Sequence, residues 1–107
     1  MVKKAKQQRK PEDQSEKSLV RVPEEYAFRC HDGSIFRDLK ELADGLFTMS
    51  DEVFVYHVNS DRNDFSNWVK NVLKDEKLAN DLATTSVKMQ ASWWVATRLT
   101  FLTNKLV

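Results

Sequence analysis

Apolar residues recur at helical spacing along much of this chain. Within residues 37–47 they fall at i, i+3, i+4 and i+7, as Leu39, Leu42, Ala43 and Leu46. Within residues 64–73 four of them share one helical face: Phe65, Trp68, Val69 and Val72. This spacing is typical of an amphipathic helix with one face in a core, so both segments are predicted to be helices. KDEKLANDLA, residues 74–83, is expected to add a short helix.

The C-terminal segment 84–107, TTSVKMQASWWVATRLTFLTNKLV, contains no acidic residue. Its aliphatic residues recur at near-heptad spacing, at Val87, Ala91, Val95, Leu99, Leu102 and Leu106. A stripe that persists over this length predicts one long terminal helix.

Two short β-prone runs flank Asp32-Gly33 in YAFRCHDGSIF, residues 26–36. Asp-Gly favours a tight turn because glycine adopts positive φ without a steric penalty. The segment is therefore predicted to be a β-hairpin, and His31 and Asp32 are read as turn residues before any ligand role is considered.

Residues 50–58, SDEVFVYHV, allow two interpretations. Ser50 followed by two acidic residues favours the start of a helix. Val53, Val55 and the aromatic residues between and beside them would equally suit a strand. We choose a short helix. After the turn NSDRND, Asn63 or Asp64 is expected to cap the helix that follows.

These elements indicate an α+β fold that is mostly α, with one N-terminal β-hairpin followed by four to five helices, the last one long. A length of 107 residues with 41% hydrophobic and 31% charged content suits a single soluble domain, and only two glycines and two prolines argue against a turn-rich all-β fold. The compact domain is expected to span residues 23–107.

Charge divides the chain although its net value is only +1. Residues 1–23 carry seven basic and three acidic groups, residues 24–83 carry seven basic and thirteen acidic groups, and residues 84–107 carry three basic groups. Residues 1–22 hold too little apolar surface to offset the entropy of ordering, so they are predicted to be a disordered basic arm. The arm could bind nucleic acid or a ribosome through its basic residues, chiefly Lys3, Lys4, Lys6, Arg9 and Lys10.

Cys30 is the one cysteine, and no secretory h-region or long apolar run is present, so a cytoplasmic protein without a membrane span is expected. A zinc site would have only Cys30, His31 and His57 as its nitrogen and sulfur ligands, at unsuitable spacing. A Cys30–His57–Asp64 nucleophile is conceivable, but a cysteine in a strand is more often a small buried apolar residue. No cofactor, metal or catalytic residue is predicted, and the chain is not expected to be an enzyme.

The span FRCHDGSIF to KLANDL, residues 28–82, resembles a family of short archaeal and bacterial domains with no assigned function. The most specific shared feature is an upstream histidine followed by Asn-Asp-Phe-x-x-Trp, here His57, Asn63, Asp64, Phe65 and Trp68. The resemblance implies a compact domain with no assigned reaction or cofactor. Its motif residues are expected to be structural, with His57 and Asp64 as neighbours.

Trp93 and Trp94 are adjacent in the terminal helix, where neighbouring residues point about 100° apart. If one indole packs inward, the other is partly exposed, and exposed tryptophan is enriched at binding hot spots. The alternative is that both cover the core. We predict a small protein-interaction domain that docks a partner or a second copy through this helix. The residues expected at the interface are Trp93, Trp94, Arg98 and Phe101.

Overall fold

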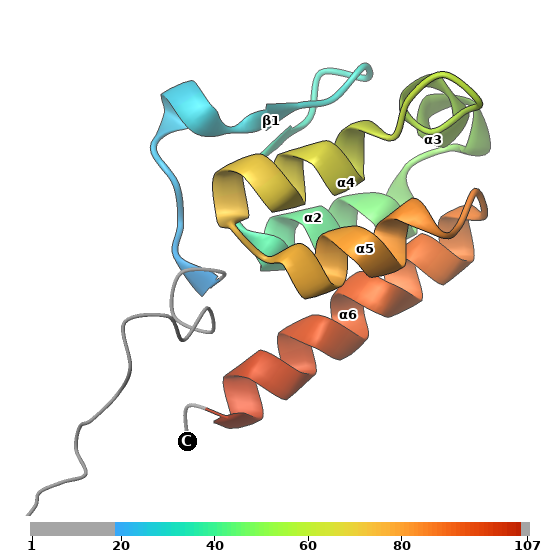
Figure 1. The fold of residues 1–107 in the computed structure, drawn as a ribbon. Helices are drawn as coiled ribbons and strands as arrows, with labels where there is room; N and C mark the ends of the chain where they lie inside the picture. The colour runs from blue at the N-terminus through green and yellow to red at the C-terminus, as the bar shows by residue number, and fades with distance from the viewer. Residues whose placement is uncertain (1–18, 106–107) are drawn as a thin grey trace, which may run out of the picture.

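The computed structural model describes residues 19–105 of the chain. A 3-10 turn, η1 (Glu24–Tyr26), leads into two antiparallel strands, β1 (Phe28–Arg29) and β2 (Ile35–Phe36). Five α-helices follow in the described part: α2 (Leu39–Thr48), α3 (Asp51–His57), α4 (Asp64–Trp68), α5 (Glu76–Ala83) and α6 (Lys88–Lys105), with a π-helix, η2 (Val69–Leu73), continuing α4. The predicted mostly α fold with one hairpin and a long last helix is confirmed (Figure 1).

The hairpin turns at the predicted dipeptide. Phe28 pairs with Phe36, and Arg29 pairs with Ile35. Gly33 has a φ of 94°, a backbone conformation that residues with a side chain rarely adopt. The Ser34 N–H donates to Asp32 Oδ1 at 2.9 Å. The local chemistry of the turn therefore sets the register that brings Phe28 and Phe36 into the core.

Helix α2 packs directly under the hairpin. Asp38 caps it by accepting from the Glu41 N–H at 2.8 Å. Further along, the Phe36 ring occupies the space that a Cβ atom on Gly45 would need. Gly45 therefore allows strand β2 to approach the helix closely.

Helix α3 confirms the helical interpretation of residues 51–57, and the strand alternative is wrong. Ser50 Oγ accepts from the Val53 N–H at 3.1 Å, which stabilises the first turn. Phe54 and His57 are buried on its inner face, while Val55 is 54% exposed. The capping serine outweighs the β propensity of the two valines.

The cap of α4 is Asn63, whose side chain accepts from the Ser66 N–H at 3.0 Å. Asp64 is the first helical residue, so of the two residues expected as the cap, Asn63 occupies that position and Asp64 does not. Asn63 also donates through Nδ2 to the Leu82 carbonyl at 3.0 Å, and Ser66 Oγ donates to the Ala79 carbonyl at 2.7 Å. These two side chains connect α4 to α5.

The core is one contiguous cluster that involves the hairpin and all five α-helices. Trp68 closes one side of it by donating from Nε1 to the Tyr26 carbonyl at 2.8 Å. Val22 is buried, and its N–H donates to the Arg37 carbonyl at 2.9 Å. The predicted arm boundary at residue 22 is therefore too late, because Val22 belongs to the core and Leu19 packs against it. Residues 1–18, with most of the predicted arm, lie outside the described residues.

Helix α6 forms one edge of the bundle, and its C-terminal half extends past α5 (Figure 1). Its buried face follows the predicted stripe at Ala91, Val95 and Leu102, with Leu99 partly buried. Val87 precedes the helix and is 57% exposed, so its place in the stripe was predicted wrongly. Leu106 lies outside the described residues. No helix from residue 19 to residue 105 has the length and apolar character to cross a membrane.

Candidate functional site

The side of α6 that faces away from the core carries large apolar side chains, and Lys105 at its end lies over the Phe101 ring. Trp93 is 58% exposed, Phe101 is 53% exposed and Met89 is 54% exposed. We define the outward face of α6 as the uncharged exposed residues on this side: Met89, Gln90, Trp93, Ala96, Thr97, Thr100, Phe101 and Asn104. Water-exposed helix faces are usually charged or polar, so this composition is typical of a surface that another molecule covers.

Trp94 lies at the edge of this face and is half-buried against the core. Its ring meets that of Trp93 edge-on, with 5.1 Å between the centroids. The two tryptophans therefore do not both cover the core. The Trp94 indole nitrogen is buried and donates to no acceptor in the described part of the chain. Such an unpaired donor is uncommon, because buried polar groups nearly always have a partner.

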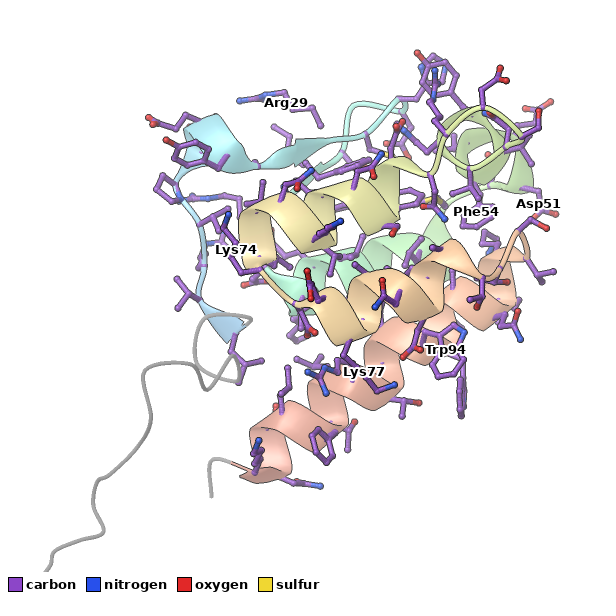
Figure 2. All side chains as sticks on the ribbon, viewed as in Figure 1. Arg29, Asp51, Phe54, Lys74, Lys77 and Trp94 are labelled. Atoms are coloured by element: carbon purple, nitrogen blue, oxygen red, sulfur yellow. The ribbon has the colours of Figure 1, made fainter. Side chains whose placement is uncertain are left out.

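A shallow groove of about 190 Å³ runs between α5 and α6 beside Trp94. Figure 2 shows Lys77 and Trp94, two of its lining residues, on the same side of the molecule. The remaining lining residues are Asp81, Thr97, Arg98 and Phe101. Lys77 pairs with Asp81 at 2.9 Å, so the charges along the α5 side compensate each other. The groove adjoins the outward face and adds to it an apolar wall.

Arg98 has a structural partner. Its guanidinium donates from Nε to Asp75 Oδ2 at 2.9 Å and from Nη2 to Oδ1 at 3.1 Å. It also lies over the Phe101 ring, with 5.5 Å from Cζ to the centroid. Of the four residues predicted at the interface, Trp93 and Phe101 are thus exposed, whereas Trp94 and Arg98 hold α6 against the domain.

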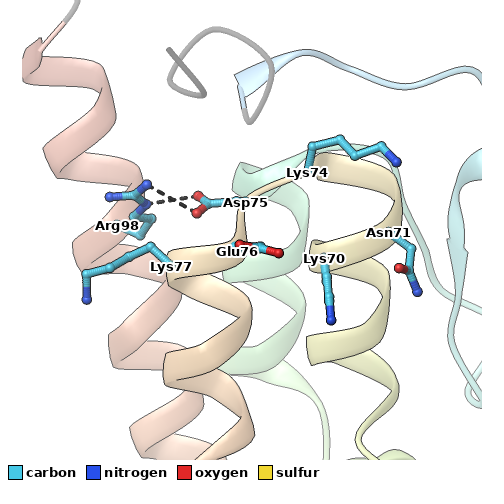
Figure 3. Close-up of a pocket in the computed structure, with 7 residues that line it drawn as sticks. All are labelled: Lys70, Asn71, Lys74, Asp75, Glu76, Lys77 and Arg98. Atoms are coloured by element: carbon cyan, nitrogen blue, oxygen red, sulfur yellow. Dashed lines mark hydrogen bonds and ion pairs between the residues drawn. The ribbon is translucent and has the colours of Figure 1, made fainter. Parts of the chain in front are cut away.

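The Asp75–Arg98 pair lies at the edge of a hollow of about 470 Å³ (Figure 3). Three lysines line it, Lys70, Lys74 and Lys77, together with Asn71 and Glu76. In Figure 3 the lysine side chains point in different directions, and Glu76 lies among them. A bound anion needs cations that converge on one point, and this hollow does not provide them.

His57 and Asp64 are neighbours, as predicted. His57 Nε2 accepts from the His31 backbone N–H at 3.0 Å, and Nδ1 lies 2.9 Å from Asp64 Oδ2. Because Nε2 is an acceptor, the neutral ring carries its hydrogen on Nδ1 and donates it to Asp64. The histidine is 4% exposed. Because one ring nitrogen bonds to the hairpin turn and the other to Asp64, the side chain connects the turn to the start of α4.

Phe65 and Trp68, the aromatic residues of the motif, are buried, and the Phe65 ring lies 4.8 Å from that of Phe28. Cys30 is also buried, and this burial raises the pKa of its thiol above the ordinary value. Among residues 19–105, no three histidine, cysteine or acidic side chains are placed to hold a metal ion. The motif positions contribute to packing and to the connection of elements.

Asp75 is the residue that the sequence analysis missed. It stands in a run of charged residues, where a solvated carboxylate is the usual interpretation, and its partner is 23 residues away. The absence of acidic residues around Arg98 could have indicated such a partner. A cation on a partly buried helix needs a counter-ion, and here only another element can provide it.

No family model matches the chain, and no match was found among curated proteins or solved structures. The resemblance to the archaeal and bacterial domain family therefore stays a prediction.

Proposed function

We propose that this chain is a small protein-interaction domain whose contact surface is the outward face of α6. The observation that carries the proposal is the exposure of Trp93 and Phe101, each more than half accessible, on one side of a helix that has no acidic residue. Tryptophan is among the residues most enriched at binding hot spots, and charged residues are depleted there.

The rigid attachment of α6 supports this proposal. Arg98 anchors the middle of the helix to Asp75, and the helix buries Ala91, Val95 and Leu102 in the core. An aromatic residue on a fixed helix loses little conformational entropy on binding. Most of the free energy gained by burying its ring therefore contributes to affinity. The alternative function, association with nucleic acid or a ribosome through Lys3, Lys4, Lys6, Arg9 and Lys10, depends on residues outside the described part.

Site-specific photo-cross-linking in cells of the source organism tests the proposal. A photoreactive phenylalanine analogue replaces Trp93 in the full-length chain, and the matched control carries it at Tyr26, which is 55% exposed and far along the chain from α6. We expect discrete protein adducts from position 93 and none of the same mass from position 26. Adducts of equal yield from both positions, or nuclease-sensitive adducts alone, would overturn the proposal.

A further inference from the structure

Thr97 lies at the centre of the outward face. At about 100° per residue, it points away from the side that buries Ala91, Val95 and Leu102. Trp93 precedes it by four residues and Phe101 follows it by four residues. The two large exposed side chains are thus placed symmetrically about one small central residue.

We infer that a second copy of this chain covers the outward face, with the two α6 helices antiparallel about a two-fold axis at Thr97. This inference rests on the proposed function and names its partner. In such a pair, a residue that precedes Thr97 faces the residue that follows Thr97 by the same number of positions in the other copy. Every contact then occurs twice.

The facing residues are chemically complementary. Trp93 faces Phe101 of the second copy, so the two exposed aromatic rings of each chain are both covered. Gln90 faces Asn104, and their amides can pair as donor and acceptor. Ala96 and Thr97 at the crossing point are small enough for the helix axes to approach closely.

Charge favours the antiparallel over the parallel arrangement of two copies. Two cations flank the outward face, because Arg98 and Lys105 both lie over the Phe101 ring. In the antiparallel pair, Arg98 faces Ala96 and Lys105 faces Met89, which keeps like charges apart. Arg98 is already neutralised by Asp75 of its own chain. A parallel pair would instead bring Arg98 next to Arg98.

The expected dimer is weak. Helix α6 has 18 residues, so the shared contact is about 27 Å long and buries less surface than a standard permanent interface. We expect dissociation in the micromolar range, because a small contact leaves little surplus over the entropic cost of association, and the monomer stays folded because its own core is intact.

Sedimentation equilibrium of the full-length chain tests the inference through a charge swap at Thr97. Across a two-fold axis, Thr97→Arg places a cation against itself, and Thr97→Glu places an anion against itself. We expect the wild type to dimerise reversibly, each variant alone to be monomeric, and an equimolar mixture of the two variants to recover the dimer. Asn67→Arg, at an exposed position on α4, should dimerise like the wild type.

Three outcomes would overturn the dimer: a wild type that is monomeric throughout the micromolar range, a dimer that both Thr97 variants keep, or a mixture that stays monomeric. A monomeric wild type whose position 93 still cross-links to another protein would refute the second copy while leaving the proposed function intact. Cross-links from position 93 to residues 1–18 of the same chain would refute both.

Discussion

Asp75 and Arg98 connect the start of α5 to the middle of α6. Asp75 is 1% exposed, and its carboxylate accepts hydrogen bonds from Nε and Nη2 of Arg98, at 2.9 Å and 3.1 Å. The same carboxylate accepts from the Leu78 N–H at 3.1 Å and so caps α5. One buried side chain therefore caps the start of α5 and positions α6, and the outward face of α6 depends on it.

Arg98→Ala should lower the free energy of unfolding by about 3 kcal/mol, because it leaves the Asp75 carboxylate buried without a cation. Urea denaturation measures this change. The control is Lys77→Ala, since Lys77 is 64% exposed in its pair with Asp81 and should cost no more than about 0.5 kcal/mol. Equal losses in the two variants would contradict the role assigned to Asp75.

Asn63→Ala should destabilise the chain by about 1–2 kcal/mol, because it removes the cap of α4 and the hydrogen bond to the Leu82 carbonyl. Asn67→Ala, on the exposed side of the same helix, is the matched control and should change stability little. Thermal unfolding followed by circular dichroism compares them. A smaller effect at Asn63 than at Asn67 would count against the assigned cap.

Gly45→Ala should cost about 1–3 kcal/mol, because the new methyl group meets the Phe36 ring. This loss opposes the usual gain in helix propensity on replacing glycine by alanine. Phe36→Leu makes room beside Gly45, so the double variant should be more stable than the sum of the two single losses predicts. Strict additivity would show that the two residues do not compete for the same space.

The Cys30 thiol should react slowly with a disulfide reagent at pH 8 in the folded chain and rapidly in urea. Burial raises its pKa, so less of it is thiolate at a given pH than in the unfolded chain, and access is also restricted. Absorbance of the released chromophore follows the reaction. Fast labelling of the native chain would revive the nucleophile interpretation of Cys30.

Local patterns predicted most of the fold because each relies on neighbours in sequence. Asp32-Gly33 encodes the hairpin turn, Ser50 begins α3, and the 3.6-residue stripe places the buried face of α2. The choice between Asn63 and Asp64 as the cap was not decided by sequence, because both side chains can accept from the same N–H groups and only the backbone geometry selects one.

Long-range relationships could not be predicted in this way. The ion pair of Asp75 with Arg98 and the hydrogen bond from His31 to His57 join segments that are 23 and 26 residues apart. Val22 was assigned to the arm because residues 1–22 together hold little apolar surface, yet it is buried and its N–H donates to the Arg37 carbonyl, 15 residues further along the chain. The sequence left open whether one indole is exposed or both cover the core. The packing of α6 exposes Trp93 and half-buries Trp94.

The outward face of α6 is tested most directly by disulfide mapping between two single-residue variants, Gln90→Cys and Asn104→Cys. Cys30 stays in both, and the wild type is the control for any reaction at that buried thiol. On mild oxidation in the micromolar range, we expect the mixture to form a disulfide-linked heterodimer rapidly, while neither variant alone links to itself, because only positions 90 and 104 face each other across the axis at Thr97. Equal linking within each variant, or no linking in the mixture, would contradict the antiparallel contact through α6.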